Sequence, residues 1–168
     1  MNSNYARQGK PNNIFEYKKC ISTFLKNPNV LSMDDFFQHG TTTCLEHCII
    51  VSYTSYRLCK FLKLDYTSAA RGALLHDLFL YNWHTVKPPE GLHAFSHPAI
   101  SLFNASKIFV LNPIEKDIIL KHMWPLTIRL PRYREALIVC IVDKYCALTE
   151  TFKFKSIKLR ALKVALEL

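Results

Sequence analysis

Histidine and aspartate residues recur along this chain on helical faces that are otherwise apolar. Over residues 43–63, apolar residues repeat at the i, i+3, i+4, i+7 spacing of one helix face, and His47 lies on that face. Four more segments carry such residues in the same way, and the full set is His47, His76, Asp77, His97, His122 and Asp143. Burying a neutral polar group without a partner costs about 2–7 kcal/mol, and an ionised carboxylate costs far more. A metal centre would give all six side chains partners at once.

Helical periodicity and turn signals predict an all-α chain of about six to seven helices. Helices are expected over residues 14–26, 43–63, 67–80 and 133–151, with others beginning near 96, at 112 and at 152. Asp65 or Thr67 is the expected N-cap of the helix over 67–80, and the run from Asn112 to Glu115 approaches a capping box. A turn is expected over 33–38. The four glycines of the chain are too few for a turn-rich β architecture, and no strand is predicted.

The sequences of two of these helices predict how the helices pack. Ala69 and Ala73 on the helix over 67–80 indicate a close approach to a neighbouring helix. The inward face of the helix over 43–63 is expected to comprise His47, Ile50, Val51, Thr54, Leu58, Phe61 and Leu62.

The length of 168 residues suits one domain, and a hydrophobic content of 49% is enough for a core without disulfides. We expect a disordered start over 1–13, a helical bundle over 14–151 and a basic helix over 152–168 packed on the bundle. The alternative for the last segment is an amphipathic helix that binds a membrane or nucleic acid. Its apolar side could equally dock on a twin subunit, so a homodimer stays open.

The net charge of +9 favours negatively charged partners, namely phosphorylated small molecules, nucleic acid or an anionic membrane surface. No apolar run approaches the roughly 18 residues of a membrane span, and the polar start lacks the core of a signal peptide. A cytoplasmic protein is therefore expected.

The six cysteines form no CxxC pair, which excludes a zinc ribbon or a thioredoxin-like motif. Cys44 and Cys48 lie one helical turn apart and could share a metal, but half-buried thiols in a reducing compartment are the simpler interpretation.

The order and helical placement of the histidines and aspartates carry the metal hypothesis. One His-Asp pair is a weak signal by itself. Here the order is His47, then His76-Asp77, His97-Pro98, His122 and Asp143, and each interval equals roughly one helix and one loop. Imidazole nitrogen and carboxylate oxygen suit iron, manganese, zinc or magnesium. The sequence therefore predicts one or two divalent metal ions.

The order H…HD…H…H…D resembles that of the HD-domain superfamily of metal-dependent phosphohydrolases. The strings LEHCIIVSYTSYRLCKFLKL, AARGALLHDLFLY, HAFSHPAISLFNASKIF, IILKHM and IVDKYCALTE have the character of that family, and the resemblance covers about residues 43–151. It implies an orthogonal helical bundle around a metal centre. The last string also resembles cyclic-di-nucleotide phosphodiesterases of the superfamily, but the chain lacks their Gly-Tyr-Pro signature, so that substrate is not assigned.

The resemblance also implies the ligand set and the reaction. His47, His76, Asp77 and Asp143 match the ligands shared by nearly all members, while His97 and His122 match the subset with two metals bridged by Asp77. The implied reaction is hydrolysis of a phosphoester or phosphoanhydride, of a nucleotide or small phosphorylated metabolite, by attack of a metal-bound hydroxide.

Further residues are candidates for substrate binding and proton transfer. Lys144, beside a ligand, is a candidate catalytic cation, and His84 and His93 are loop candidates for proton donation or for a lid. His39 is a weaker candidate of the same kind. The candidates for phosphate and substrate binding are Arg71, Lys121, Arg129, Arg132, Arg134, Trp124 and Trp83.

Two rival functions remain open. The same ligands resemble those of HD-fold di-iron oxygenases, which use dioxygen to open a carbon–carbon or carbon–phosphorus bond. The second rival is a non-catalytic HD module that senses a nucleotide. Nucleic acid as a partner is possible but not favoured. The ligand set alone distinguishes neither the native metal nor the substrate.

Overall fold

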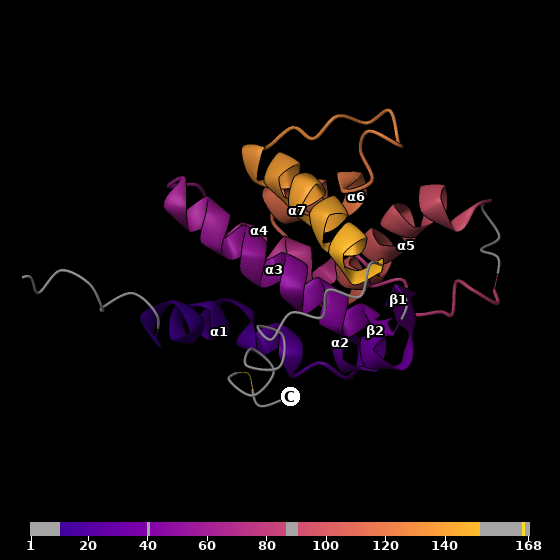
Figure 1. Ribbon diagram of the computed structural model, residues 1–168, viewed down its shortest axis with the longest axis horizontal. Coiled ribbons are helices and arrows are strands. Elements are labelled where there is room, and N and C mark those ends of the chain that lie inside the picture. Colours follow the sequence, from indigo (N-terminus) through magenta and orange to yellow (C-terminus); the bar gives the residue numbers. More distant parts are fainter. Residues whose placement is uncertain (1–10, 40, 87–90, 152–165, 167–168) are drawn as a thin grey trace, which may run out of the picture.

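Seven α-helices make up most of residues 11–39, 41–86, 91–151 and 166, which are the residues that the computed structural model describes (Figure 1). This confirms the all-α prediction. The elements in chain order are α1 (Pro11–Leu25), α2 (Pro28–Leu31), the 3₁₀ helix η1 (Ser32–Asp35), β1 (Phe37–His39), β2 (Thr42–Thr43), α3 (Cys44–Phe61), α4 (Tyr66–Leu75), α5 (His93–Ile108), α6 (Pro113–Lys121) and α7 (Arg134–Thr151).

The segment before α3 differs from its prediction. Instead of one turn over 33–38, the chain forms η1 and then a short antiparallel pair of β1 and β2, in which Phe37 faces Thr43. The expectation that the chain has no strand was therefore wrong for this small hairpin. The pairing carries Gln38 into the protein interior, where it is buried.

Helix α3 crosses the middle of the molecule in Figure 1 and packs against α4 and α7. Its N-terminal end follows a capping box, in which the Thr43 hydroxyl accepts from the Glu46 N–H and the Glu46 carboxylate accepts from the Thr43 N–H. The inward face predicted for its second half was wrong, since Leu58, Phe61 and Leu62 are exposed and Ser55 and Cys59 are buried. Helices α4 and α7 both pack against α3. The buried surface of α3 is therefore broader than one apolar stripe and is rotated relative to the predicted face.

Helix α4 is shorter than predicted, and this difference shapes the site. It begins after Asp65, whose side chain accepts from the Ser68 N–H as an N-cap, and it ends at Leu75 instead of Leu80. His76 is the C-cap residue, so the His-Asp pair lies at the end of the helix and not within it. The chain then turns, and Leu80 has a positive φ of 57°.

Helices α4 and α6 approach each other closely at Gly72. A Cβ atom at this position would lie 2.8 Å from Ile118 Cδ1, so only glycine fits without displacing the isoleucine. The sequence predicted this close approach from Ala69 and Ala73, which are buried on the same helix. The N-terminus of α6 has the predicted capping box between Asn112 and Glu115.

The ends of the chain lie largely outside the described residues. Helix α1 begins at Pro11, three residues before the predicted start, and residues 1–10 are not described. The basic helix predicted over 152–168 also lies outside the described residues, apart from Leu166, which is buried in the hydrophobic core. Among the described helices, none has both the length and the apolar character needed to cross a membrane.

Candidate metal centre

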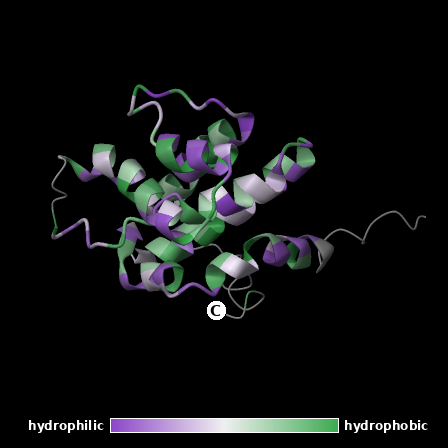
Figure 2. Cartoon of the chain, turned by 180° about the vertical axis from the view of Figure 1, so that it is seen from behind, coloured by the Kyte–Doolittle hydropathy of each residue, from purple (hydrophilic) through white to green (hydrophobic). Residues whose placement is uncertain are grey.

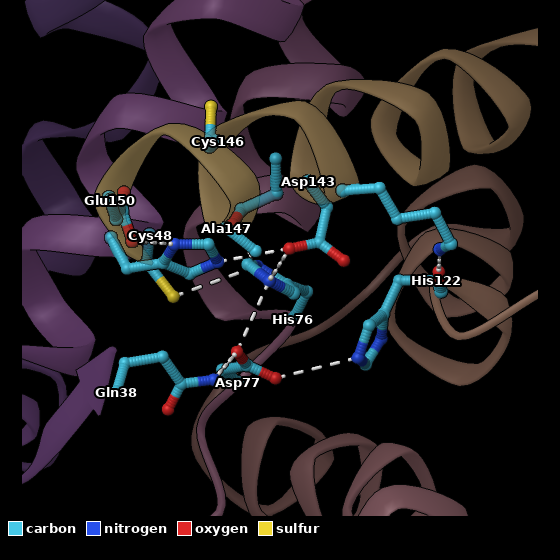
Figure 3. Close-up of polar contacts among 12 residues, drawn as sticks. Gln38, Cys48, His76, Asp77, His122, Asp143, Cys146, Ala147 and Glu150 are labelled. Atoms are coloured by element: carbon cyan, nitrogen blue, oxygen red, sulfur yellow. Dashed lines mark hydrogen bonds and ion pairs between the residues drawn. The ribbon is translucent and has the colours of Figure 1, made fainter. Parts of the chain in front are cut away.

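Six side chains from five helical segments meet in the interior of the bundle. They come from α3, the ends of α4 and α6, the first half of α5, and the middle of α7. Figure 3 shows His76, Asp77, His122 and Asp143 turned toward one another. These are the residues that the sequence pattern selected: His47, His76, Asp77, His97, His122 and Asp143. All six are buried, and none is more than 8% exposed.

Two carboxylates organise the cluster. Asp143 Oδ1 lies 3.0 Å from His47 Nε2 and 3.6 Å from His76 Nε2. Asp77 Oδ2 lies 3.3 Å from His76 Nε2 on one side. On its other side, Asp77 Oδ1 lies 3.3 Å from His97 Nε2 and 3.4 Å from His122 Nε2. Asp77 therefore spans the gap between two groups of imidazoles.

Each of the four imidazoles has its Nδ1 atom beside an acceptor. His76 Nδ1 lies 2.7 Å from the carbonyl oxygen of Ala73, and His122 Nδ1 lies 2.9 Å from that of Ile119. The partner of His97 Nδ1 is the carbonyl oxygen of His93 at 2.8 Å, and that of His47 Nδ1 is Glu150 Oε2 at 2.9 Å. A carbonyl or carboxylate oxygen only accepts, so every Nδ1 carries the proton. In a neutral ring the other nitrogen, Nε2, then carries a lone pair. These Nε2 atoms face one another and the two carboxylates.

These lone pairs lack ordinary partners. Among the described residues, His76 Nε2 and Asp77 Oδ1 are buried and have no hydrogen-bond partner. His97 Nε2 and His122 Nε2 lie only 2.7 Å apart. With both Nδ1 atoms protonated, two neutral rings at this distance would place lone pair against lone pair, so the pair needs either a proton on one Nε2 or a metal ion beside both. The donor set thus fits metal ions.

The electrostatics of the cluster also favour positive charge at its centre. Burial opposes a charged ring at His47 and His76, yet the carboxylates of Asp143, Glu150 and Asp77 outweigh it and raise the pKa of both histidines well above the ordinary value. Burial alone would raise the pKa of Asp77 and Asp143, but the neighbouring histidines outweigh it and lower both. Both carboxylates therefore stay ionised, and cations stabilise them.

His122 behaves differently from His47 and His76. Its burial, followed by repulsion from His76 and His97, lowers its pKa to about 3. The ring is uncharged at neutral pH, so its Nε2 lone pair is available to a metal ion. Two three-residue groups in the cluster place one ligand atom each within 4.8 Å of one another, namely His47–His76–Asp143 and His76–Asp77–His122.

Cys44 and Cys48 lie directly behind the His-Asp pair. Together with Asp77 they form a third group whose ligand atoms are equally close. However, Cys44 Sγ donates to the Asp77 carbonyl oxygen at 3.3 Å, and Cys48 Sγ lies 3.6 Å from His76 Nδ1. Burial raises the pKa of both thiols, which keeps them protonated. Both thiols are fully buried, not half-buried as expected, and they contact the neighbouring ligands Asp77 and His76.

Two residues that the sequence did not single out contact the cluster. Gln38 Nε2 donates to Asp77 Oδ2 at 2.6 Å, and the Gln38 side chain approaches from β1 in Figure 3. Glu150 holds His47 Nδ1, as described above, and is two turns beyond Asp143 on α7. The seven-residue spacing of Asp143 and Glu150 was the available signal for Glu150. No local pattern marks Gln38, because it reaches the site from a hairpin.

The cations predicted to clamp phosphate have protein partners. Lys144 Nζ donates to the His122 carbonyl oxygen at 2.9 Å, at the C-terminus of α6. Arg71 Nε lies 3.0 Å from Glu115 Oε1, and Lys121 Nζ lies 2.7 Å from Asp117 Oδ1. Of these three, only Lys144 bonds to a residue of the metal cluster, so it stays the strongest of them as a substrate contact.

The loop before α7 holds the remaining basic candidates. Arg129, Arg132 and Arg134 are exposed, and Trp124 at the start of the loop is half-buried. The structure does not bring these residues into the metal cluster through any recorded contact among the described residues.

His93 and Trp83 form a ring stack next to the metal cluster. His93 stacks on His97 with a centroid distance of 4.5 Å and on Trp83 with one of 5.0 Å. Burial, followed by repulsion from His97, lowers the pKa of His93 to about 4. The uncharged ring is a weak proton donor near neutral pH, and its position suits orienting His97. His84 is exposed, and its ring lies against that of Trp83 with a centroid distance of 3.8 Å. The side chain of His39, in β1, lies outside the described residues.

Comparison of the chain with models of protein families, with curated proteins and with solved structures finds no match. The function of the chain is therefore inferred from the geometry of the cluster.

Proposed function

We propose that this protein is a metal-dependent phosphohydrolase of the HD-domain type. Its substrate would be a phosphoester or phosphoanhydride of a nucleotide or another small phosphorylated metabolite in the cytoplasm. The observation that supports the proposal best is the fixed orientation of four imidazoles, each with Nδ1–H bound to an acceptor and Nε2 turned toward two buried carboxylates. The order of these residues along the chain is the one that resembles the HD domain.

The residues divide naturally between two ions. His47, His76 and Asp143 would hold one, His97 and His122 the other, and Asp77 offers one oxygen to each side. Divalent ions bound there would polarise a phosphoryl oxygen and lower the pKa of a bound water molecule to near 7. Gln38 and Glu150 keep Asp77 and His47 in position. Lys144, which donates to the His122 carbonyl oxygen, would bind a substrate phosphate, and the Trp83–His93 stack borders the same cluster through His97.

Metal content tests the first half of this proposal. The protein would be purified without chelator or affinity metal, and its iron, manganese, zinc and magnesium measured by plasma mass spectrometry. Asp77→Asn keeps the size of the side chain but removes its charge, and we expect it to lose the metal. Asp35→Asn is the matched control, because Asp35 is an exposed carboxylate outside the cluster. A wild-type protein that takes up none of these ions would exclude the metal centre and leave a polar core network.

Substrate turnover tests the second half. The metal-loaded protein would be assayed against a panel of nucleotides and other phosphoesters, with and without oxygen. We expect phosphate release that does not depend on oxygen and is lost in Asp77→Asn. Oxygen consumption coupled to substrate cleavage would favour the di-iron oxygenase instead. Ligand binding without turnover, in a protein that is fully loaded with metal, would favour a sensing module.

A further inference from the structure

The loop between α6 and α7, residues 122–133, presents aliphatic side chains and arginines next to each other on the surface. Ile128 is 97% exposed, Leu130 62% and Leu126 51%. Arg129 and Arg132 alternate with them and are also exposed. The loop runs along the edge of the molecule at the top of Figure 1, and Figure 2 shows hydrophobic and hydrophilic segments alternating along it. A cluster of exposed aliphatic residues of this kind marks a binding surface.

Along residues 123–149 the chain carries no exposed carboxylate, and the exposed Asp65 lies beside the start of α7, where its backbone N–H donates to Glu135 Oε1. Between residues 123 and 149 the only acidic residues are Glu135 and Asp143, and both are 8% exposed. Within the described part of the chain, no ion pair engages Arg129, Arg132 or Arg134. The loop therefore combines exposed aliphatic side chains with Arg129 and Arg132, which form no ion pair within the described residues.

The loop is held in place at its ends. Asp117 Oδ2 accepts from the backbone N–H groups of Arg132 at 2.7 Å and Tyr133 at 3.1 Å. Near the start of the loop, the Thr127 N–H donates to the Met123 carbonyl oxygen at 3.2 Å. These hydrogen bonds fix both ends of the loop, and Ile128 lies exposed between them.

We propose that this loop docks on an anionic phospholipid surface. Ile128 and its two leucine neighbours would enter the acyl boundary, while the arginines would bind lipid phosphates. The inference is independent of the metal centre and of the proposed hydrolase activity. It assigns the protein a second kind of binding surface, with a membrane as its partner.

The chemistry of the loop favours lipid over other occupants. Nucleic acid sites stack bases on aromatic rings, whereas the fully exposed residues here are aliphatic. A second copy of the same loop would bring its two arginines against Arg129 and Arg132 and repel them. The chain's own segment over 152–168 is also basic, with Lys153, Lys155 and Lys158 in its first half, so charge disfavours it as the cover.

Vesicle co-sedimentation tests this proposal on the full-length protein, with chelator present so that metal chemistry plays no part. Vesicles of phosphatidylcholine alone would be compared with vesicles in which phosphatidylglycerol replaces part of it. We expect binding to the anionic vesicles, weakened by salt. Ile128→Ser should reduce it by about tenfold or more, and Arg129→Gln by about fivefold. The matched controls are Val110→Ser, at a position that is 95% exposed, and Arg57→Gln on α3, and both should bind like the wild type.

Several outcomes would overturn the proposal. Absence of binding to anionic vesicles is one, and binding that both loop variants retain in full is another, because it would place the lipid contact elsewhere, such as in the basic segment over 152–168. Salt-sensitive binding to single-stranded RNA but not to vesicles would point to nucleic acid. Self-association that Ile128→Ser abolishes, measured by light scattering without vesicles, would assign the loop to a second copy. Circular dichroism spectra of all variants would be compared with that of the wild type to check that each is folded.

Discussion

At the scale of single residues, the ends of two helices decide which nitrogen of a histidine is free. The last carbonyl groups of an α-helix have no partner within the helix. His76 and His122 are the C-cap residues of α4 and α6, and their Nδ1–H groups bind the carbonyl oxygens three residues earlier, at Ala73 and Ile119. The same hydrogen bond satisfies the helix end and fixes the ring tautomer, so that Nε2 points into the cluster. His47 lies inside a helix and needs Glu150 for this purpose.

Replacing Glu150 should therefore weaken metal binding without unfolding the protein. Glu150→Ala removes the acceptor of His47 Nδ1–H, and the loss of such a partner lowers metal affinity by about 10–100-fold. Glu150→Gln keeps an acceptor oxygen but loses the charge, so a smaller loss is expected. Competition with a metal-binding dye measures the affinity. Glu16→Gln is the control, since Glu16 pairs with Lys60. Equal affinity in Glu150→Ala and the wild type would show that Glu150 does not position His47.

Gln38 should act on Asp77 in the same manner. Its amide donates to Asp77 Oδ2, so Gln38→Leu leaves that oxygen without its donor while keeping a side chain of similar bulk. We expect a loss of metal affinity of about tenfold or more. Gln38→Glu places a second carboxylate beside Asp77 and should shift the pH dependence of metal binding as well. Unchanged affinity and pH dependence in both variants would rule out a positioning role for Gln38, provided that thermal unfolding shows them folded.

At the scale of elements, the distance between α4 and α6 sets the spacing of the metal ligands. The two helices carry His76–Asp77 and His122 at their ends, and they meet where Gly72 faces Ile118. A larger residue at this contact would push α4 and α6 apart, and this would change the distance between the ligands at their ends. The sequence indicated a close approach, but only the packing identified glycine as the residue that permits it.

Gly72→Ala tests this contact. Alanine favours a helix over glycine by about 1 kcal/mol, but overpacking at Ile118 costs about 1–3 kcal/mol. A net loss in the free energy of unfolding on the order of 1 kcal/mol is therefore expected. Ile118→Val removes the nearest atom, Cδ1, so the double variant should be more stable than the sum of the two single changes predicts. Denaturant unfolding measures all four proteins, and strict additivity would mean that the two side chains do not clash.

At the scale of the whole molecule, the ligands come from five segments that span residues 47–143. Ions held by all five would bind the folded state and not the unfolded chain, in which these residues are far apart. Binding of this kind stabilises a protein by mass action. Without ions, the bundle must bury two ionised carboxylates, and protonated histidines of the cluster supply the positive charge that lowers the pKa of both.

Chelation should consequently lower the melting temperature. A ligand at 100 times its Kd stabilises the folded state by about 2.7 kcal/mol, which corresponds to about 5–10 °C in Tm for a chain of this size. We expect chelator to lower the Tm of the wild type by this amount and to leave that of Asp77→Asn unchanged. Differential scanning calorimetry provides the measurement. A metal-loaded wild type with the same Tm before and after chelation would contradict binding at a site shared by five segments.

The sequence by itself determined the helical character of the chain, the capping of α6 and the set of six polar residues on apolar faces. These features are visible in the sequence because periodicity and capping act over a few residues. Several expectations failed where neighbours intervene. Helix α4 ends five residues early, the buried side of α3 is rotated in its second half, and β1 pairs with β2.

The tertiary structure alone decided what surrounds the six residues. Gln38 contacts Asp77 across 39 positions, and Glu150 contacts His47 across 103. No local pattern encodes such pairs, because they depend on how whole helices pack. The same holds for Lys144 and Arg71, whose partners lie 22 and 44 positions away, whereas Lys121 pairs with Asp117 at the local i,i+4 spacing. Local spacing selects the residues that must be buried together and orients His76, His97 and His122 through nearby carbonyl oxygens. Packing supplies the distant partners that hold His47 and Asp77.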